Sequence, residues 1–124
     1  MNIYFVVSAI LLFIVSLFHS ILGEKRTIGP LVNSDLLDSI YKDKRINWRK
    51  KLRRGWHLTT IAWWSIGVVI IDLARMKNPS PLSVNAIAIP FAIIGITGIV
   101  RSKGKHPSGL LLFVSMLLWA GLYL

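Results

Sequence analysis

Three histidines and one glutamate are the side chains of this sequence that could act together chemically. His19 lies one turn before the end of the first apolar segment, with Glu24 shortly after it, while His57 opens the second segment and His106 precedes the last. Because an α-helix rises ~1.5 Å per residue, the three imidazoles are expected within roughly 5 Å of one level. Neutral imidazole ligates Zn, Cu, Fe and Ni. One hypothesis is therefore a metal site, or a haem iron held by two of the histidines.

A pocket beside these residues is predicted from the second apolar segment. His57, Thr60, Trp64 and Gly67 follow one another at intervals of three and four residues. That spacing places them on one face of a helix. Thr60 and Trp64 are the predicted lining residues, with Gly67 leaving room beside them.

A purely structural interpretation of the histidines stays open. Histidine has an apolar body and a polar tip, so it is stable at a membrane interface. His19 could bond Thr60 or a backbone carbonyl and only join two helices. The chain has no cysteine, which excludes thiolate metal sites, disulfides and cysteine nucleophiles. No motif fixes a reaction, and the sequence favours a non-enzymatic protein over an enzyme.

The elements that must position these residues are four apolar segments. Hydrophobic residues make up 54% of the 124 residues, and they are gathered in blocks rather than spread amphipathically as in a soluble domain. A spanning helix needs ~20 mostly apolar residues. The predicted spans are Ile3–Leu22, Trp56–Leu73, Leu82–Val100 and Ser108–Leu124. We therefore predict one all-α domain over residues 1–124, an integral membrane four-helix bundle.

The charge distribution predicts how this bundle is oriented. Net charge is +10, and ten of the fifteen Lys and Arg residues lie between Lys25 and Arg54. The second connection carries two cations and the third carries three, so connections one and three together hold thirteen against two. Such cation-rich loops stay cytoplasmic. The prediction is a bacterial cytoplasmic membrane protein with both termini outside and anionic lipid headgroups, not nucleic acid, as partners.

The basic loop over residues 23–55 is predicted to contain an amphipathic helix in the headgroup layer. Asn33 or Ser34 could cap it, and a turn at Ile28–Leu31 would separate it from the first span. Its apolar positions are Leu37, Tyr41, Trp48 and Leu52. Its predicted headgroup-binding cations are Lys44, Arg45, Arg49, Lys50, Lys51, Arg53 and Arg54. The alternative is a solvated basic loop.

Three short segments together resemble a known group of proteins. They are Phe18–Glu24, with the pattern H-S-x-L-G-E, then Trp56–Thr59, and Lys105–His106. They resemble segments of small bacterial four-helix integral membrane proteins that have no established function. The resemblance implies the same topology, and it draws attention to His19, Glu24, His57 and His106. It implies no reaction.

Three functions therefore remain as hypotheses. The first is a lipid- or partner-interacting membrane unit, whose partner would be a second copy of the chain in a homo-oligomer or another membrane protein. The second is a metal- or haem-binding redox protein that uses the interfacial histidines. The third is a small oligomeric transporter. Small cation exporters of this size carry a membrane-embedded glutamate in the first span, and Ile3–Leu22 contains no carboxylate.

Overall fold

The computed structural model describes residues 1–40 and 47–124, and all regular structure in those ranges is helical. The elements are α1 (Ile3–Gly23), the π-helical turn η1 (Glu24–Ile28), α2 (Gly29–Val32), α3 (Leu36–Ile40), α4 (Trp48–Arg75), α5 (Pro81–Ser102), the 3-10 turn η2 (Pro107–Gly109) and α6 (Leu110–Tyr123). Within these described ranges, three helices are long and apolar enough to cross a membrane: Ile3–Val32, Trp48–Arg75 and Pro81–Ser102. Pro107–Tyr123 is a shorter apolar helix. The all-α prediction is confirmed for the described residues.

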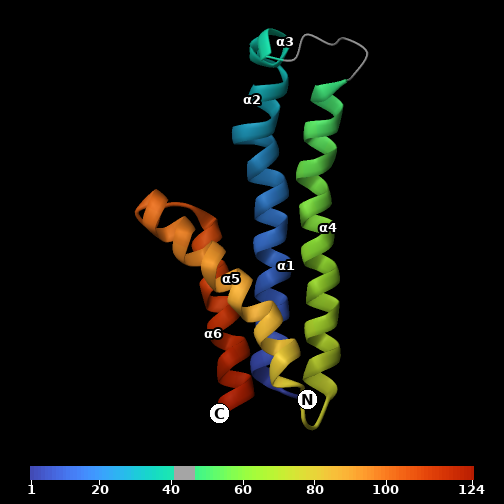
Figure 1. The fold of residues 1–124 in the computed structure, drawn as a ribbon, viewed down its shortest axis with the longest axis vertical. Helices are drawn as coiled ribbons and strands as arrows, with labels where there is room; N and C mark the ends of the chain where they lie inside the picture. Colours follow the sequence, from blue (N-terminus) through green and yellow to red (C-terminus); the bar gives the residue numbers. More distant parts are fainter. Residues whose placement is uncertain (41–46) are drawn as a thin grey trace.

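The helices form a bundle from which one helix pair projects (Figure 1). α4 runs beside α1, α6 packs on α1, and α5 crosses α6. Both termini lie at the same end as the α4–α5 connection. At the other end, η1 and α2 continue from α1 alongside the start of α4, past the α5–α6 corner. We call this projecting pair, residues 24–40 and 47–55, the hairpin.

The bundle core is apolar, with small residues where the helices approach closely. One buried cluster includes residues of α1, α4, α5 and α6, with Phe5, Leu12, Ile70 and Phe91 among its large members. On α5 the core is contributed partly by the small residues Ala88, Ala92 and Gly95. Small residues let two helix backbones come together where lipid supplies no hydrophobic drive.

Two buried serines add polar links between helices. The Ser8 hydroxyl of α1 donates to the Val114 carbonyl of α6 at 3.1 Å. The Ser115 hydroxyl of α6 donates to the Ala88 carbonyl of α5 at 2.6 Å. Both serines are fully buried, so each bond satisfies a hydroxyl that could not otherwise be satisfied in an apolar core.

The predicted turn at Ile28–Leu31 is wrong, because the chain stays helical from Ile3 to Val32. Pro30 cannot donate a backbone hydrogen bond, and its ring crowds the preceding turn. The helix widens there instead: the Gly29 N–H bonds the Glu24 carbonyl, five residues back. A Cβ on residue 29 would lie 2.6 Å from that oxygen, so the wide turn requires glycine.

The predicted loop and its long amphipathic helix also differ from the structure. Gly23–Val32 and Trp48–Gly55 belong to the long helices. In the described part of the loop only Leu36–Ile40 forms a separate helix, and Tyr41 and Lys42 lie among the undescribed residues. Both segments extend the long helices because they form a second small core, in which Ile28, Val32 and Leu37 pack with Leu52 and Trp56. These apolar side chains bury against one another within the hairpin.

Candidate functional site

A chain of polar side chains joins α1 to α4 where the apolar part of α1 ends. Nε2 of His57 lies 3.1 Å from a carboxylate oxygen of Glu24, and Nδ1 lies 3.0 Å from the Ser20 hydroxyl. That hydroxyl lies 2.6 Å from Oγ1 of Thr60. The other Glu24 oxygen accepts from Nε of Arg53 at 2.8 Å. We call these five residues the polar clamp.

The chemical capacity of the polar clamp is limited by its surroundings. The order Glu24, His57, Ser20 is that of the carboxylate, imidazole and hydroxyl of a catalytic triad. However, the Ser20 hydroxyl is shared with Thr60, which is only 3% exposed. Glu24, His57 and Ser20 do not line the cavity described below. The arrangement is suited to fixing the register of two helices, with both carboxylate oxygens occupied.

His19 and Trp56 form a second contact between the same helices. Their rings stack with centroids 4.4 Å apart and planes at 8°. Nε1 of Trp56 donates to the His19 carbonyl at 2.9 Å. The indole lies against Gly23, where an added Cβ would overlap the ring. The ring of Trp63 meets His19 on α1 at 4.9 Å. The result is a fixed aromatic wall.

This wall borders a cavity of about 290 Å³ between α1, α4 and the α5–α6 corner, which we call the corner cavity. α1 and η1 supply Val15, Phe18, His19, Leu22, Gly23, Arg26 and Thr27; α4 supplies Trp56 and Trp63; the corner supplies His106, Pro107 and Ser108. Its lining is apolar toward the bundle and polar toward the hairpin. It could hold a molecule that has both characters.

The structure divides the four predicted site residues into two pairs. His19 and His106 line the corner cavity, whereas His57 and Glu24 are joined in the polar clamp. Consecutive helix positions point about 100° apart, and His57 does not line the cavity that Trp56 borders. Among residues 1–40 and 47–124, no group of three or more His, Cys, Asp or Glu side chains could hold a metal ion.

The predicted pocket-lining residues lie elsewhere. Thr60 is buried in the polar clamp, and the side chain of Trp64 is 40% exposed on the outside of α4. Trp63, its neighbour, lines the corner cavity. The sequence did not reveal which face of α4 meets the corner: Trp56 and Trp63 line the cavity, and the predicted Thr60 and Trp64 do not.

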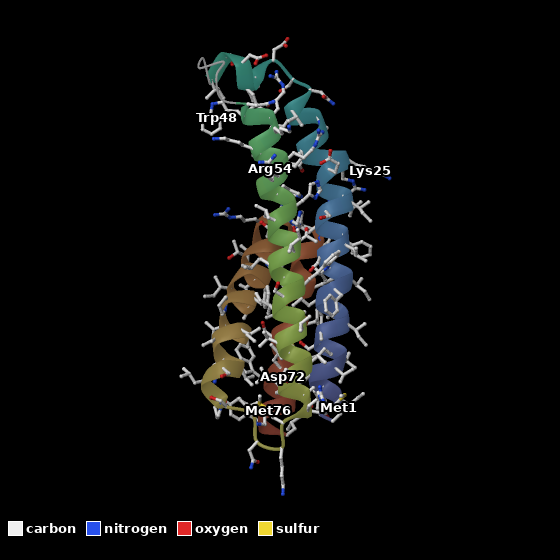
Figure 2. The ribbon with its side chains drawn as sticks, turned by 90° about the vertical axis from the view of Figure 1, so that its right-hand side faces the viewer. Met1, Lys25, Trp48, Arg54, Asp72 and Met76 are labelled. Atoms are coloured by element: carbon white, nitrogen blue, oxygen red, sulfur yellow. The ribbon has the colours of Figure 1, made fainter. Side chains whose placement is uncertain are left out.

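The predicted headgroup cations have different environments. Lys44 and Arg45 lie outside the described residues. Lys50, Lys51 and Arg54 are exposed on the hairpin, and Figure 2 shows Arg54 and Lys25 at this same end of the molecule. Arg53 pairs with Glu24. These exposed cations stay available to anionic groups outside the protein.

The Arg49 side chain instead forms hydrogen bonds within the hairpin. Its guanidinium donates to both oxygens of Asp38, at 2.9 and 2.7 Å, and its Nε donates to the Val32 carbonyl at 2.6 Å. A fourth hydrogen bond reaches the Ser34 carbonyl at 3.3 Å. One side chain thus ties the end of α2 and α3 to the start of α4.

Arg49→Lys is expected to loosen the hairpin tip although it keeps the charge. A lysine cannot reproduce the planar fork that binds the Asp38 carboxylate with two parallel bonds. We expect several-fold faster amide hydrogen exchange over residues 32–40. The matched control is Lys50→Arg, at the exposed neighbouring position, which should leave exchange unchanged. Equal exchange in both variants would show that Arg49 does not hold the tip.

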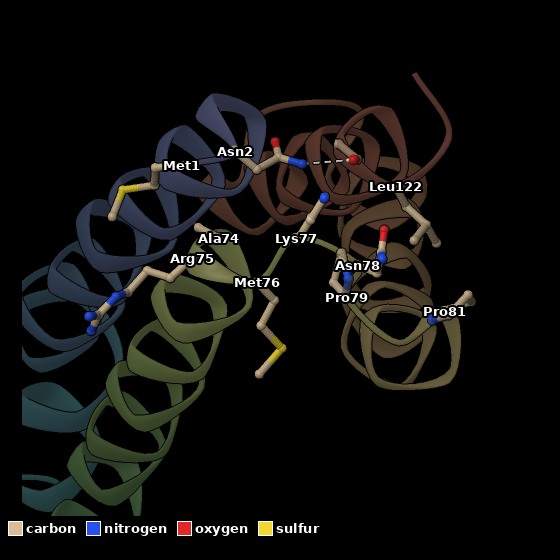
Figure 3. A pocket seen from close by; sticks show the side chains of 11 residues that line it. Met1, Asn2, Ala74, Arg75, Met76, Lys77, Asn78, Pro79, Pro81 and Leu122 are labelled. Carbon is tan, nitrogen blue, oxygen red and sulfur yellow. Dashed lines mark hydrogen bonds between the residues drawn. The ribbon is translucent and has the colours of Figure 1, made fainter.

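A second cavity, of about 790 Å³, lies at the opposite end, near both termini (Figure 3). Asn2 organises its edge: its Oδ1 caps α1 and its Nδ2 donates to the Gly121 carbonyl at 2.8 Å. The Asn2 N–H donates to the Ala74 carbonyl at 2.8 Å. This set of bonds fastens α1 to α4 and α6, and we assign it a structural role.

Ser20 and Trp56 are not among the site residues predicted from the sequence, and Arg53 is predicted only as a headgroup-binding cation, not as a partner of Glu24. A spacing signal was present: Ser20 and Glu24 are one turn apart, as are Arg53 and His57. Two such pairs on antiparallel helices can meet. Whether they meet depends on the relative register of the two helices, which the sequence does not predict.

The chain matches no known family model, no curated protein and no solved structure. Its function is therefore argued from the geometry.

Proposed function

We propose that this chain is a four-helix integral membrane protein that binds anionic lipid headgroups at its cation-rich end and catalyses no reaction. The observation that carries the proposal is the projecting hairpin. Lys25, Arg26, Lys50, Lys51 and Arg54 are all exposed on it. The surface of the bundle below exposes large apolar side chains, among them Ile10, Leu17, Val68 and Ile93.

Helix lengths support this division into a membrane part and a headgroup part. Ile3–Val32 has 30 residues and α4 has 28, which gives lengths of about 45 and 42 Å. A hydrocarbon layer is ~30 Å thick. If the ends near the termini lie at one membrane surface, the hairpin emerges at the other, among the headgroups. Pro107–Tyr123 would be the fourth span, with its shortness accommodated by local thinning.

The orientation is testable because the chain has no cysteine. We propose that the hairpin is cytoplasmic, since the thirteen cations of connections one and three lie on one side. In intact cells, Asn78→Cys in the α4–α5 connection should react with a membrane-impermeant maleimide. Ser39→Cys in α3 should react only after permeabilisation. The reverse labelling pattern would overturn the orientation.

The lipid preference is tested on protein extracted in polymer-bounded membrane discs. We expect anionic phospholipid to be enriched in these discs relative to the source membrane. Lys50→Gln, Lys51→Gln and Arg54→Gln combined should reduce the enrichment, because each cation near an anionic surface contributes about 1 kcal/mol. The control removes Arg75 and Lys77 at the other end. A disc composition equal to that of the membrane would refute the proposed function.

A further inference from the structure

We propose that the corner cavity is a specific site for one anionic phospholipid, with the phosphate at its hairpin side and an acyl chain along its apolar side. This inference rests on the proposed function, and it adds a defined site to the diffuse attraction of the hairpin. The occupant follows from the chemistry of the lining, which changes from apolar to cationic over two helical turns.

The lining changes from apolar to cationic along one face of α1 and its helical extension η1. Phe18, Leu22 and Arg26 line the corner cavity at successive intervals of four residues, so they stand one above another. The two lower positions are apolar and the upper one is a cation. A molecule lying along this face meets hydrocarbon first and then a guanidinium, in the order in which a lipid presents its chain and its phosphate.

A neighbouring groove of about 460 Å³ extends the apolar part. It shares Phe18, Leu22 and His106 with the corner cavity and adds Leu110, Phe113 and other apolar residues of the corner. Phe18 and Phe113 are about half exposed on the outside of the bundle. The groove is therefore open to the surrounding hydrocarbon, from which a lipid chain could enter.

The polar part favours an anion. Arg26 lines the corner cavity, and Lys105 lines the neighbouring groove beside His106. Both are exposed, and neither forms an ion pair with another described residue. Nδ1 of His106 accepts the Ser108 N–H at 3.1 Å, so in the neutral ring Nε2 carries the proton. Within residues 1–40 and 47–124, no carboxylate lines either cavity. Arginine and histidine donors beside a lysine suit a phosphate group.

The wall of the cavity is fixed before any ligand binds. The His19 ring contacts the rings of both Trp56 and Trp63, and Trp63 also meets Phe91 edge to face at 6.0 Å. A preformed wall reduces the ordering cost of binding. Aromatic side chains of this kind are common at membrane interfaces.

The test is native mass spectrometry of the full chain in detergent with a short-chain phosphatidylglycerol. We expect the wild type to retain one lipid at the lowest lipid concentrations. Arg26→Gln with Lys105→Gln should weaken this first binding by about tenfold or more, since charge-assisted bonds are lost. Arg101→Gln with Lys103→Gln removes the same charge from exposed positions near the α5–α6 corner that line neither cavity, and should leave the first binding unchanged.

Each outcome has a separate meaning. If the wild type binds phosphatidylglycerol no better than phosphatidylcholine, the proposed function fails, and this inference with it. If anionic lipid is preferred but both double variants weaken it equally, the proposed function stands and the corner site is refuted. If inorganic phosphate displaces the first lipid at equal concentration, the ligand is a free anion and the lipid assignment is overturned.

Discussion

Trp56→Ala is expected to destabilise the protein by about 3 kcal/mol, the lower range for loss of a large packed aromatic side chain. The indole contributes to three contacts at once. It stacks on His19, donates to the His19 carbonyl and packs on the hairpin core with Ile28 and Val32. Its removal also exposes Gly23, over which the ring lies. The measurement is the free energy of unfolding from an SDS titration followed by circular dichroism.

Trp64→Ala is the matched control for this prediction. The Trp64 side chain is 40% exposed on the outside of α4, and its truncation should cost less than about 1 kcal/mol. The two variants lose the same atoms from the same helix, so their difference reports only the environment of the ring. Equal losses would mean that Trp56 does not join α1 to α4.

Gly95→Ala is expected to destabilise the bundle by about 2 kcal/mol, within the range for overpacking a close contact. A Cβ on residue 95 would overlap the backbone of Leu112 on α6. A main-chain neighbour cannot turn aside as a flexible side chain can, so α5 and α6 must move apart. The same SDS titration measures the loss.

Gly55→Ala is the control for the glycine substitution. No atom lies within 4 Å of a Cβ added there, and the position is exposed on the helix α4. Alanine is favoured over glycine in a helix interior by up to about 1 kcal/mol, so this variant should be as stable as the wild type or slightly more so. If Gly95→Ala were equally harmless, the close approach of α5 and α6 would be refuted.

The Trp56 substitution affects the corner cavity as well as the stability of the protein. Trp56 belongs both to the hairpin core and to the cavity wall. A lipid-binding loss in Trp56→Ala would therefore mix unfolding with loss of the site. The charge variants at Arg26 and Lys105 avoid this problem because both side chains are exposed and support no described contact of the core.

The sequence by itself determined the helical class and the three long apolar helices, because hydrocarbon tolerates such segments only when their backbone bonds are satisfied internally. It also predicted His19 and His106 at one level, since His19 lies near the end of the first apolar segment and His106 just before the start of the last; both line the corner cavity. The level of a residue along a helix axis can be predicted by counting residues, because the rise per residue is constant.

The tertiary structure decided which sides of the helices meet. Rotation about a helix axis is set by packing, such as that of Gly23 under Trp56, and this separated His57 from the cavity and put Trp63 there in place of Trp64. Tertiary contacts also kept Gly29–Val32 helical, because burial of Ile28 and Val32 against α4 outweighed the local tendency of Gly29-Pro30 to turn. Both outcomes depend on contacts between residues distant in the chain, which no local pattern encodes.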